Sequence, residues 1–380
     1  MKIVFISGML PSGHFSQILT SGIAANNKDL IIYTDKDRDN LKIKNCGKIK
    51  LVWDRSPIYI WQILKELKKD KPDIVHLQQE LNMYGGLSTV VLFPLLVIGI
   101  KLLGVPLVVT LHASVFKKQI DHKFTKLFHK EGINPSLLKF FFDYLFRSVS
   151  LFADSIVVHS NLSKKILTTD YGVSASKTTV IPCAIPHYRL KKYRRQPYFF
   201  YFGYMVRRKG LSYALDGFAR FLKKYPKSKY KLVLAGGVIK GQEKALDEIK
   251  SFIAKNKLEN KVEILGFQNQ SDLPPLYGKA TAVIIPAVIS MGSSGPLYHA
   301  NSFHKCIITT DIGHFKEDID QHVTGIRVAN NRWHEAFELV ANNAKMVKQI
   351  EKNVATKALS RTPKKTGKKY LKLYQSVINH

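Results

Sequence analysis

Short apolar runs recur along the chain at strand length, and stretches of helix length separate most of them. In the first half these runs lie at 2–7 (KIVFIS), 30–34 (LIIYT), 73–77 (DIVHL), 106–111 (PLVVTL), 155–160 (SIVVHS) and 178–182 (TTVIP). Of the stretches between them, IYIWQILKELKK at 58–69 is amphipathic at helical spacing. Uninterrupted apolar strands are typical of sheets covered on both faces, and strands that alternate with helices form βαβ units. The pattern therefore predicts a parallel α/β sheet.

The alternation stops once and then restarts. Residues 182–198 hold three prolines and a basic run without periodicity, which is typical of a linker. Strand-like runs follow at 198–203, 231–237, 261–267, 282–287, 306–311 and 324–328. We therefore expect two doubly wound, Rossmann-like domains that face each other across a cleft, with ligands at the carboxyl ends of the strands. The expected boundaries are 1–185 for the first domain, 186–197 for the linker, 198–362 for the second domain and 363–380 for a terminal helix.

The charge balance limits the classes of binding partner that the protein is expected to have. The 380 residues include 59 Lys and Arg against 28 Asp and Glu, a net charge of +31. Such a field favours anionic partners: a phosphorylated small molecule, an anionic membrane surface or nucleic acid. A solvated lysine surface without a partner is the alternative. Because no zinc-finger, homeodomain or RNP pattern is present, nucleic acid ranks last. Three scattered cysteines and a strand-like N-terminus indicate a reducing, cytoplasmic setting.

The segment 87–111 is nearly apolar throughout. A membrane-spanning helix needs about 20 unbroken apolar residues. Pro94, Lys101, Gly104 and Pro106 interrupt this segment. We therefore expect a buried helix over about 87–103 and a buried strand over 106–111 rather than a span.

Two stretches of the second half have the chemistry of anion sites. At 198–221 a strand ends in a glycine turn, and Arg207, Arg208 and Lys209 precede an amphipathic helix. Helix dipole, free N–H groups and cations together suit a diphosphate, although three solvated cations would give the same pattern. At 291–302 the small residues Gly292, Ser293, Ser294 and Gly295 open a helix, and such a turn also offers N–H groups to an anion.

The order of these pieces resembles the family 4 glycosyltransferases of the GT-B fold, in particular a bacterial subgroup. DIVHLQQELNMYGG (73–86) is similar to that subgroup's aspartate–valine–histidine–x–glutamine–x–glutamate stretch. VVTLHA, ADSIVVHSNLSKKIL, TTVIPCAIP, FGYMVRRKGLSYAL, LVLAGG and SSGPLYHANSFHKCIITTDIG follow in the family's order. The tail KKYLKLYQSVI resembles the family's last helix, which crosses back onto the N-terminal domain. The resemblance covers essentially the whole chain.

The resemblance implies a retaining transferase that moves a sugar from a nucleotide diphosphate sugar to an acceptor. It implies no cofactor and no strictly needed metal ion, with the donor on the C-terminal domain and the acceptor on the N-terminal one. By position, Lys209 matches the family's diphosphate lysine, and Tyr204 stands where an arginine is frequent, so Arg207 or Arg208 would supply that charge. His112 matches a histidine that reaches the donor sugar near the reacting carbon. A strand-end histidine bonded to backbone is the alternative for His112.

Further positions follow from the same alignment. Gly13 and His14 lie in the loop that approaches the diphosphate and the acceptor, and Glu80 is an acceptor-side carboxylate. The base would contact the region of Gly266 and Phe267. The ribose or the sugar would contact Gly292 and His299 of the turn at 291–302.

That turn departs from the family. The family usually has a glutamate at each end of it, and Met291 and His299 stand at those positions here. The serines and Gly295 can still hold phosphate through backbone N–H groups. Two hypotheses therefore stay open: an active transferase, and a catalytically silent GT-B domain that is a partner or scaffold in glycan assembly. A GT-B nucleotide-sugar epimerase ranks below both, because the acidic and histidine pairs that its chemistry wants are missing.

The leading expectation is a cytoplasmic transferase on the inner membrane face, building a surface polysaccharide or glycolipid from a glycan or lipid-linked acceptor. The aromatic and basic stretch 115–149 is a candidate for lipid contact. Ordinary helices that pack Phe140, Phe141, Leu145 and Phe146 into the domain are the alternative.

Overall fold

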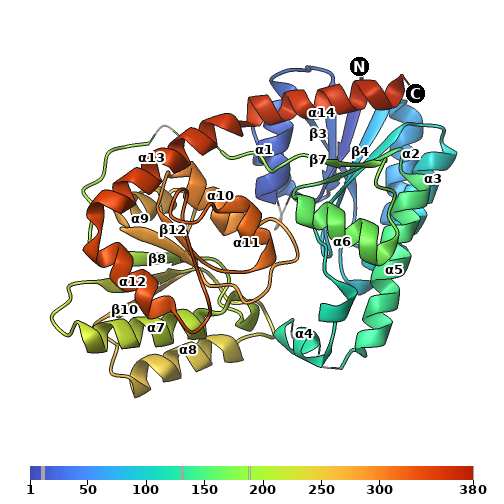
Figure 1. The fold of residues 1–380 in the computed structure, drawn as a ribbon. Coiled ribbons are helices and arrows are strands. Elements are labelled where there is room, and N and C mark those ends of the chain that lie inside the picture. Colours follow the sequence, from blue (N-terminus) through green and yellow to red (C-terminus); the bar gives the residue numbers. More distant parts are fainter. Residues whose placement is uncertain (10–12, 129, 131, 187, 189, 380) are drawn as a thin grey trace.

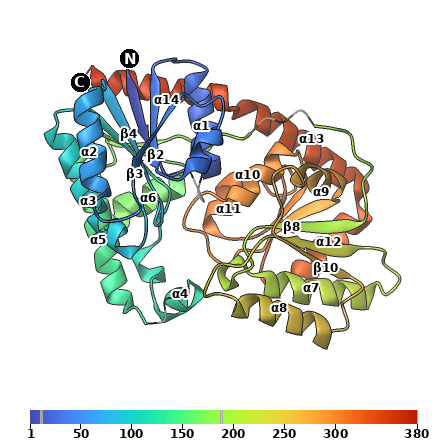
Figure 2. The same cartoon turned by 180° about the vertical axis from the view of Figure 1, so that it is seen from behind.

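The computed structural model describes residues 1–9, 13–128, 130, 132–186, 188 and 190–379. Over these residues the chain forms two parallel sheets, and helices lie on both faces of each sheet (Figures 1 and 2). The first sheet belongs to the N-terminal half of the chain and the second to the C-terminal half. The predicted fold class, two Rossmann-like α/β units, is confirmed.

The N-terminal sheet has the strand order β3-β2-β1-β4-β5-β6-β7, and its neighbouring strands pair in parallel. Its strands are β1 (Ile3–Ile6), β2 (Leu30–Asp35), β3 (Lys48–Trp53), β4 (Ile74–Gln79), β5 (Leu107–Leu111), β6 (Ser155–Val158) and β7 (Thr178–Val180). Strand β3 was not among the strands expected from the sequence. This strand lies at the sheet edge, and its first four residues are exposed or half-buried, so lysines interrupt the apolar run.

Helices cover both faces of this sheet. One face carries α2 (Tyr59–Asp70), α3 (Leu87–Leu102), α5 (Pro135–Phe152) and α6 (Asn161–Tyr171). The other face carries α1 (Gly13–Ala24) and the C-terminal helix α14 (Pro363–Ile378). Short turns of helix complete the domain: η1 (Arg38–Lys42), η2 (Lys117–Gln119) and α4 (His122–Leu127).

The apolar segment 87–111 forms the expected helix and strand, α3 followed by β5. The expectation that the helix is buried was wrong for one side of α3, where Leu87 and Leu102 are exposed. Among the described residues, no helix combines the length and the apolar content that crossing a bilayer needs. For the segment 115–149 the structure tests the packing expectation. Leu145 and Phe146 are buried and Phe141 packs partly into the core, whereas Phe140 is 70% exposed. Packing of all four residues was therefore wrong for Phe140, because the faces of α5 alternate between core and solvent.

The C-terminal sheet has the strand order β10-β9-β8-β11-β12-β13, again with parallel neighbours. Its strands are β8 (Tyr198–Phe202), β9 (Lys231–Ala235), β10 (Val262–Gly266), β11 (Ala282–Ile285), β12 (Ile307–Thr310) and β13 (Ile326–Val328). One face carries α7 (Leu211–Lys224), α8 (Lys244–Lys255), α12 (Trp333–Asn342) and α13 (Ala344–Ser360). The other face carries α9 (Leu273–Lys279), α10 (Gly295–Ser302) and α11 (Gly313–Asp318).

The chain passes between the sheets twice. No described residue between Val180 and Tyr198 lies in a helix or strand, and α13 leads into α14, which lies along α1 (Figure 1). The two helices pack backbone to backbone, since a Cβ atom on Gly22 would lie 2.0 Å from the carbonyl oxygen of Pro363. Helices approach this closely only where glycine stands at the crossing.

The domains also touch at the carboxyl edges of their sheets. The backbone N–H of Ser114 donates to the carbonyl of Met291 over 2.5 Å. The carboxylate of Glu317 in α11 accepts from the N–H of Asn161 over 2.7 Å at the first turn of α6, where the helix dipole favours a negative charge. The loops that follow β5 and β11 therefore lie against each other.

Candidate active site

His112 follows β5 directly and lies where the two domains meet. A Cβ atom on Gly292 would lie 2.0 Å from the carbonyl oxygen of His112, so only glycine allows the loop after β11 to approach this closely. The parallel sheet brings His112 to the domain boundary, because β5 is an interior strand and the residues after its carboxyl end contact the loop after β11. His112 and Gly292, far apart in the sequence, are thus neighbours.

A buried hydrogen-bond chain orients the His112 ring. The His112 Nε2–H donates to Gln78 Oε1 over 2.6 Å. The Gln78 amide Nε2 donates to His76 Nε2 over 2.8 Å, and the other ring nitrogen of His76 is hydrogen bonded to Tyr374 of α14. Gln78 Oε1 only accepts, so this arrangement places the His112 proton on Nε2 and leaves a lone pair on Nδ1.

Burial keeps these histidines neutral. It lowers the pKa of His112 well below 6.5, with further contributions from the nearby His159 and His76. It likewise lowers the pKa of His76 to about 3 and that of His159 to about 4. Phe15 of α1 packs on both His112 and His159, with ring centroids 4.7 Å apart in each case. His112 is therefore a fixed, uncharged hydrogen-bonding group.

The basic turn at 207–209 is a single 3-10 turn, η3 (Arg207–Lys209), fixed by glycine and by the neighbouring loop. Gly210 ends it with φ +64°, and a Cβ atom there would lie 2.0 Å from the carbonyl oxygen of Pro286. The N–H of Val288 donates to the Arg208 carbonyl over 3.1 Å. The basic turn is thus tied to the loop that leads into the 291–295 turn.

The three cations of η3 differ in their surroundings. Arg207 forms an ion pair with Glu248 of α8 at 2.6 Å. Arg208 lies over the ring of Phe128, 5.4 Å from its centroid, and interacts electrostatically with the exposed Glu80. For the Lys209 ammonium the described residues provide no hydrogen bond or ion pair.

Burial, and then the charge of Arg208, lower the pKa of Lys209 to about 8. An uncompensated, desolvated cation beside a second cation is unfavourable unless an anion joins them. Arg208 and Lys209 therefore form the cationic centre of the site, whereas Arg207 already has a carboxylate partner.

The turn before α10 is the second stretch that the sequence predicts to bind an anion. Ser294 is the N-cap residue of α10, and its buried Oγ has no hydrogen-bond partner among the described residues. Ser293 Oγ accepts from Tyr298 over 3.3 Å, and Gly295 begins the helix. Met291 packs against the N-terminal core, so the side chain at the first glutamate position is apolar and faces the other domain. The turn itself contains no carboxylate.

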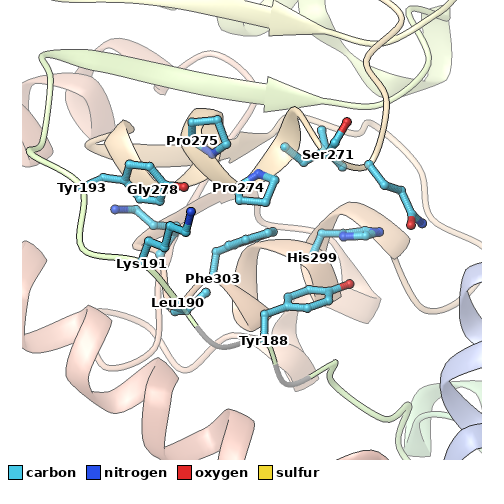
Figure 3. A pocket seen from close by; sticks show the side chains of 13 residues that line it. Tyr188, Leu190, Lys191, Tyr193, Ser271, Pro274, Pro275, Gly278, His299 and Phe303 are labelled. Carbon is cyan, nitrogen blue, oxygen red and sulfur yellow. The ribbon is translucent and has the colours of Figure 1, made fainter. Parts of the chain in front are cut away.

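His299 lies on the buried side of α10 and lines a cavity of about 470 Å³ (Figure 3). Tyr188 and Phe303 stack on each other with ring centroids 5.4 Å apart, and Ser271 closes another side. The region predicted to contact the base comprises the end of β10 and the loop after it, where Gly266 has φ +68° and Phe267 is 77% exposed. An exposed aromatic ring of this kind suits stacking on a base.

Other predicted residues lie around the cleft. Gly13 begins α1, and the side chain of His14 and residues 10–12 lie outside the described part of the structure. Tyr204, at the position where the family frequently has an arginine, is 44% exposed. Among the described residues, no cluster of three His, Cys, Asp or Glu could hold a metal ion.

Four residues around this candidate site were not expected from the sequence. Gln78, His159 and Phe15 surround His112, and Phe128 lies under Arg208. The HLQ stretch of β4 contained the signal for Gln78, because alternate residues of a strand share one face. No sequence pattern indicated Phe128, which comes from a loop far from η3 in the chain.

Known structures share this architecture. The crystal structure of Anabaena Alr3699/HepE in complex with UDP has a TM-score of 0.78 at 15% identity, covering 99% of this chain and 100% of that one. The crystal structure of WaaG, a glycosyltransferase involved in lipopolysaccharide biosynthesis, has a TM-score of 0.65 at 13% identity, covering 98% and 99%. At these identities the likeness shows the fold, two Rossmann-like domains of the GT-B type.

Two family models match consecutive parts of the sequence. The model described as Glycosyltransferase Family 4 matches residues 17–189. The model described as Glycosyl transferases group 1 matches residues 187–357. The chain is a family 4-like GT-B glycosyltransferase. The resemblance drawn from the sequence motifs is thereby confirmed.

This glycosyltransferase also has a curated relative. It is 23% identical over 196 residues to the uncharacterized glycosyltransferase MJ1059 of Methanocaldococcus jannaschii. That alignment covers 48% of this chain and spans 45% of the relative's length. It agrees with the family assignment over about half of the chain.

We expect Gln78→Leu to lower turnover of the glycosyltransferase about tenfold, or about 1.4 kcal/mol, because the His112 ring loses the hydrogen bond that fixes its tautomer. Steady-state kinetics should show the loss in kcat, with little change in KM for the donor. Gln78→Glu retains an acceptor oxygen, raises the pKa of His112 and should add an acid-side limb to the pH profile.

Gln79→Leu is the matched control for this prediction. Gln79 is the next residue of β4 and is buried, and its Oε1 has no partner among the described residues. Equal losses of kcat for Gln78→Leu and Gln79→Leu would show that the strand only needs polar residues for folding, and would contradict a positioning role for Gln78.

Proposed function

We propose that this protein is a retaining, cytoplasmic glycosyltransferase that uses a nucleotide diphosphate sugar as donor. The observation that carries the proposal is the convergence of three elements at the cleft: the cationic pair Arg208–Lys209, the α10 N-terminal turn and His112. HepE, which shares the fold, has been solved with UDP and with UDP-glucose. A diphosphate matches two neighbouring cations and a helix N-terminus in charge.

In this proposal the site stabilises the leaving group. The bond between the anomeric carbon and the diphosphate oxygen breaks, and negative charge grows on the diphosphate. Arg208, Lys209 and the N–H groups of the α10 turn lie where that charge develops, so they act more strongly on the transition state than on the bound donor. With two side chains in this role, we expect activity to survive a chelator.

Retention of configuration requires the acceptor oxygen to enter from the face that the diphosphate leaves. The new bond joins this oxygen to the anomeric carbon, and the acceptor proton moves to the departing diphosphate oxygen. Met291 stands where a carboxylate would face the sugar, so the turn offers no competing base. In this proposal His112 Nδ1 accepts a hydrogen bond from a sugar hydroxyl, and Glu80, which interacts electrostatically with Arg208, is the acceptor-side carboxylate.

The other partners belong to the same proposal. The ribose contacts His299, and the base stacks near Phe267. WaaG, which shares the fold, is involved in lipopolysaccharide biosynthesis, so we place this protein in surface polysaccharide or glycolipid synthesis on the inner membrane face. The acceptor is then a glycan or a lipid-linked sugar.

Calorimetric titration with UDP-, GDP- and ADP-sugars tests the proposal. We expect one nucleotide class to bind with a Kd in the range from about 1 μM to 1 mM, as substrates of enzymes commonly do. Turnover of the bound donor, followed as release of nucleoside diphosphate, should continue in EDTA. If the folded protein binds none of these donors, the cleft is not a donor site and a scaffold role replaces the proposed reaction.

A further inference from the structure

One outer side of the N-terminal domain exposes large apolar side chains. Of the twenty large hydrophobic residues that are exposed among the described residues, ten lie on α2, α3 and α5 or at the N-cap of α2. These helices are neighbours, since α3 packs against both α2 and α5, and Figures 1 and 2 show them together away from the C-terminal domain. We call this surface the outer apolar face.

The face is made of helical stripes rather than scattered residues. Leu87, Val91 and Leu95 of α3 are spaced four apart and are 71%, 43% and 48% exposed, and Leu102 continues the line at 82%. The opposite side of α3 is buried in the core. In a helix that is apolar on both its buried and its outward side, the outward side indicates contact with a second apolar environment.

The neighbouring helix α5 repeats this arrangement. Leu137, Phe140 and Leu151 are 63%, 70% and 71% exposed on its outer side, whereas its inner side packs into the core. Trp61 of α2 adds an indole that is 64% exposed, and the Lys65 ammonium lies 4.7 Å from its ring centroid. Exposed tryptophan beside lysine is typical of side chains at a membrane interface.

The charges around the outer apolar face are cationic. Lys65, Lys68 and Lys139 have no ion pair among the described residues. The acidic residues of these helices are all neutralised: Glu66 and Asp70 pair with Lys50, and Asp143 pairs with Lys117 and Arg147. Two copies of the chain that met at this face would bring like charges together at a net charge of +31 each. An anionic surface has the complementary sign.

The face begins at the acceptor side of the cleft. In a parallel sheet the helices start at the carboxyl edge of the strands, and that edge lines the cleft. Trp61, Leu87 and Leu137 lie in the first turns of their helices, and Glu80 at the end of β4 precedes α3. A surface seated on this face would therefore reach the mouth of the cleft.

We propose that the outer apolar face docks the protein on an anionic phospholipid bilayer, with the acceptor side of the cleft opening at the bilayer surface. The apolar stripes of α3 and α5 enter the boundary between headgroups and acyl chains, and the lysines remain among the headgroups. The proposal rests on the proposed function only in that a lipid-linked acceptor would lie in this bilayer. Docking itself requires neither donor nor acceptor.

Sedimentation of the purified full chain with vesicles tests the docking. Vesicles of phosphatidylcholine with about one-third phosphatidylglycerol should carry the protein down, and phosphatidylcholine alone should carry much less. Leu95→Glu and Phe140→Glu should each weaken partitioning at least about tenfold, because a carboxylate replaces an inserted apolar side chain. Leu359→Glu on α13 is the matched control, since Leu359 is 50% exposed and Leu95 is 48% exposed. Thermal unfolding checks that all three variants fold.

Three results would overturn the proposal: no sedimentation of the wild type with either vesicle, unchanged sedimentation of Leu95→Glu and Phe140→Glu, or an equal loss for Leu359→Glu. Sedimentation velocity without lipid tests whether a second copy of the chain occupies the face instead. A concentration-dependent dimer that Leu95→Glu breaks would assign the face to a second copy. Donor titrations on the same variants distinguish the two proposals. Docking without donor binding would contradict only the proposed transferase function. Donor binding without docking would contradict only the proposed role of the outer apolar face.

Discussion

Lys209→Ala should weaken donor binding at least about tenfold, or about 1.4 kcal/mol, in calorimetric titration with the nucleotide sugar that the wild type binds. The Lys209 ammonium has no hydrogen bond or ion pair among the described residues, and it lies beside Arg208. The free protein therefore holds two neighbouring cations that a diphosphate would neutralise. Removing one of them takes away a charge-assisted contact in a desolvated site, where such contacts are strongest.

The same lysine gives the binding a pH dependence. Because burial and Arg208 lower the pKa of Lys209 to about 8, the ammonium loses its proton as the pH rises through that value. Donor affinity should be full below pH 8 and fall as the pH rises above it. The fall should end at the higher pKa that Lys209 has in the complex, because the bound diphosphate stabilises the charged form. Lys209→Arg keeps its charge and should bind the donor without this alkaline loss.

Arg207→Ala is the control within the same turn. Arg207 is paired with Glu248, so its removal should change donor affinity much less than Lys209→Ala does. Equal losses in the two variants would indicate a general effect of net charge. Unchanged affinity and turnover in Lys209→Ala would remove Lys209 from the site.

The alternation of strands and helices was readable from the sequence because most strands are buried on both faces. Such strands are continuous apolar runs, as in IVFI of β1 and AVII of β11. The edge strand β3 was not predicted, because lysines at its exposed start interrupt the apolar run. Local composition thus predicts a strand whose two faces are both buried in the core. It does not reveal a strand that has one face in contact with water.

The candidate site was readable where its residues are adjacent in the chain. Arg208, Lys209 and the turn at 292–295 are local patterns with a chemical meaning. The partners of His112 were not readable, because Gln78, Phe15 and Gly292 come from three different elements. Likewise the sequence could not separate Arg207 from Arg208, since the difference depends on a carboxylate of α8.

The outer apolar face also could not be predicted fully from the sequence. The sequence placed lipid contact in the stretch 115–149, which includes most of α5, whereas further exposed apolar side chains lie on α2 and α3. A buried helix was expected over about 87–103, but only one side of α3 is buried. Because α3 is apolar on every side, its periodicity could not show which residues point outward.

His112→Ala should lower turnover about 100-fold, the scale of losing a positioned hydrogen-bonding group at the reacting centre. Donor affinity should change little, because the proposed diphosphate contacts Arg208 and Lys209 lie on the other domain. Gln78 fixes the His112 proton on Nε2, and in the proposed reaction the lone pair on Nδ1 accepts from a hydroxyl of the transferred sugar. His112→Asn retains an acceptor close to the ring and should restore part of the rate.

The pH profile distinguishes this role from that of a titrating acid or base. Burial and the neighbouring histidines lower the pKa of His112 well below 6.5, so the ring is neutral at and above that pH. Wild-type turnover should therefore show no acid limb near pH 6.5. His334→Ala, which removes a histidine of α12 away from the cleft, is the matched control and should keep the wild-type rate. Full turnover in a folded His112→Ala variant would mean that the ring serves only the packing of Phe15 and His159.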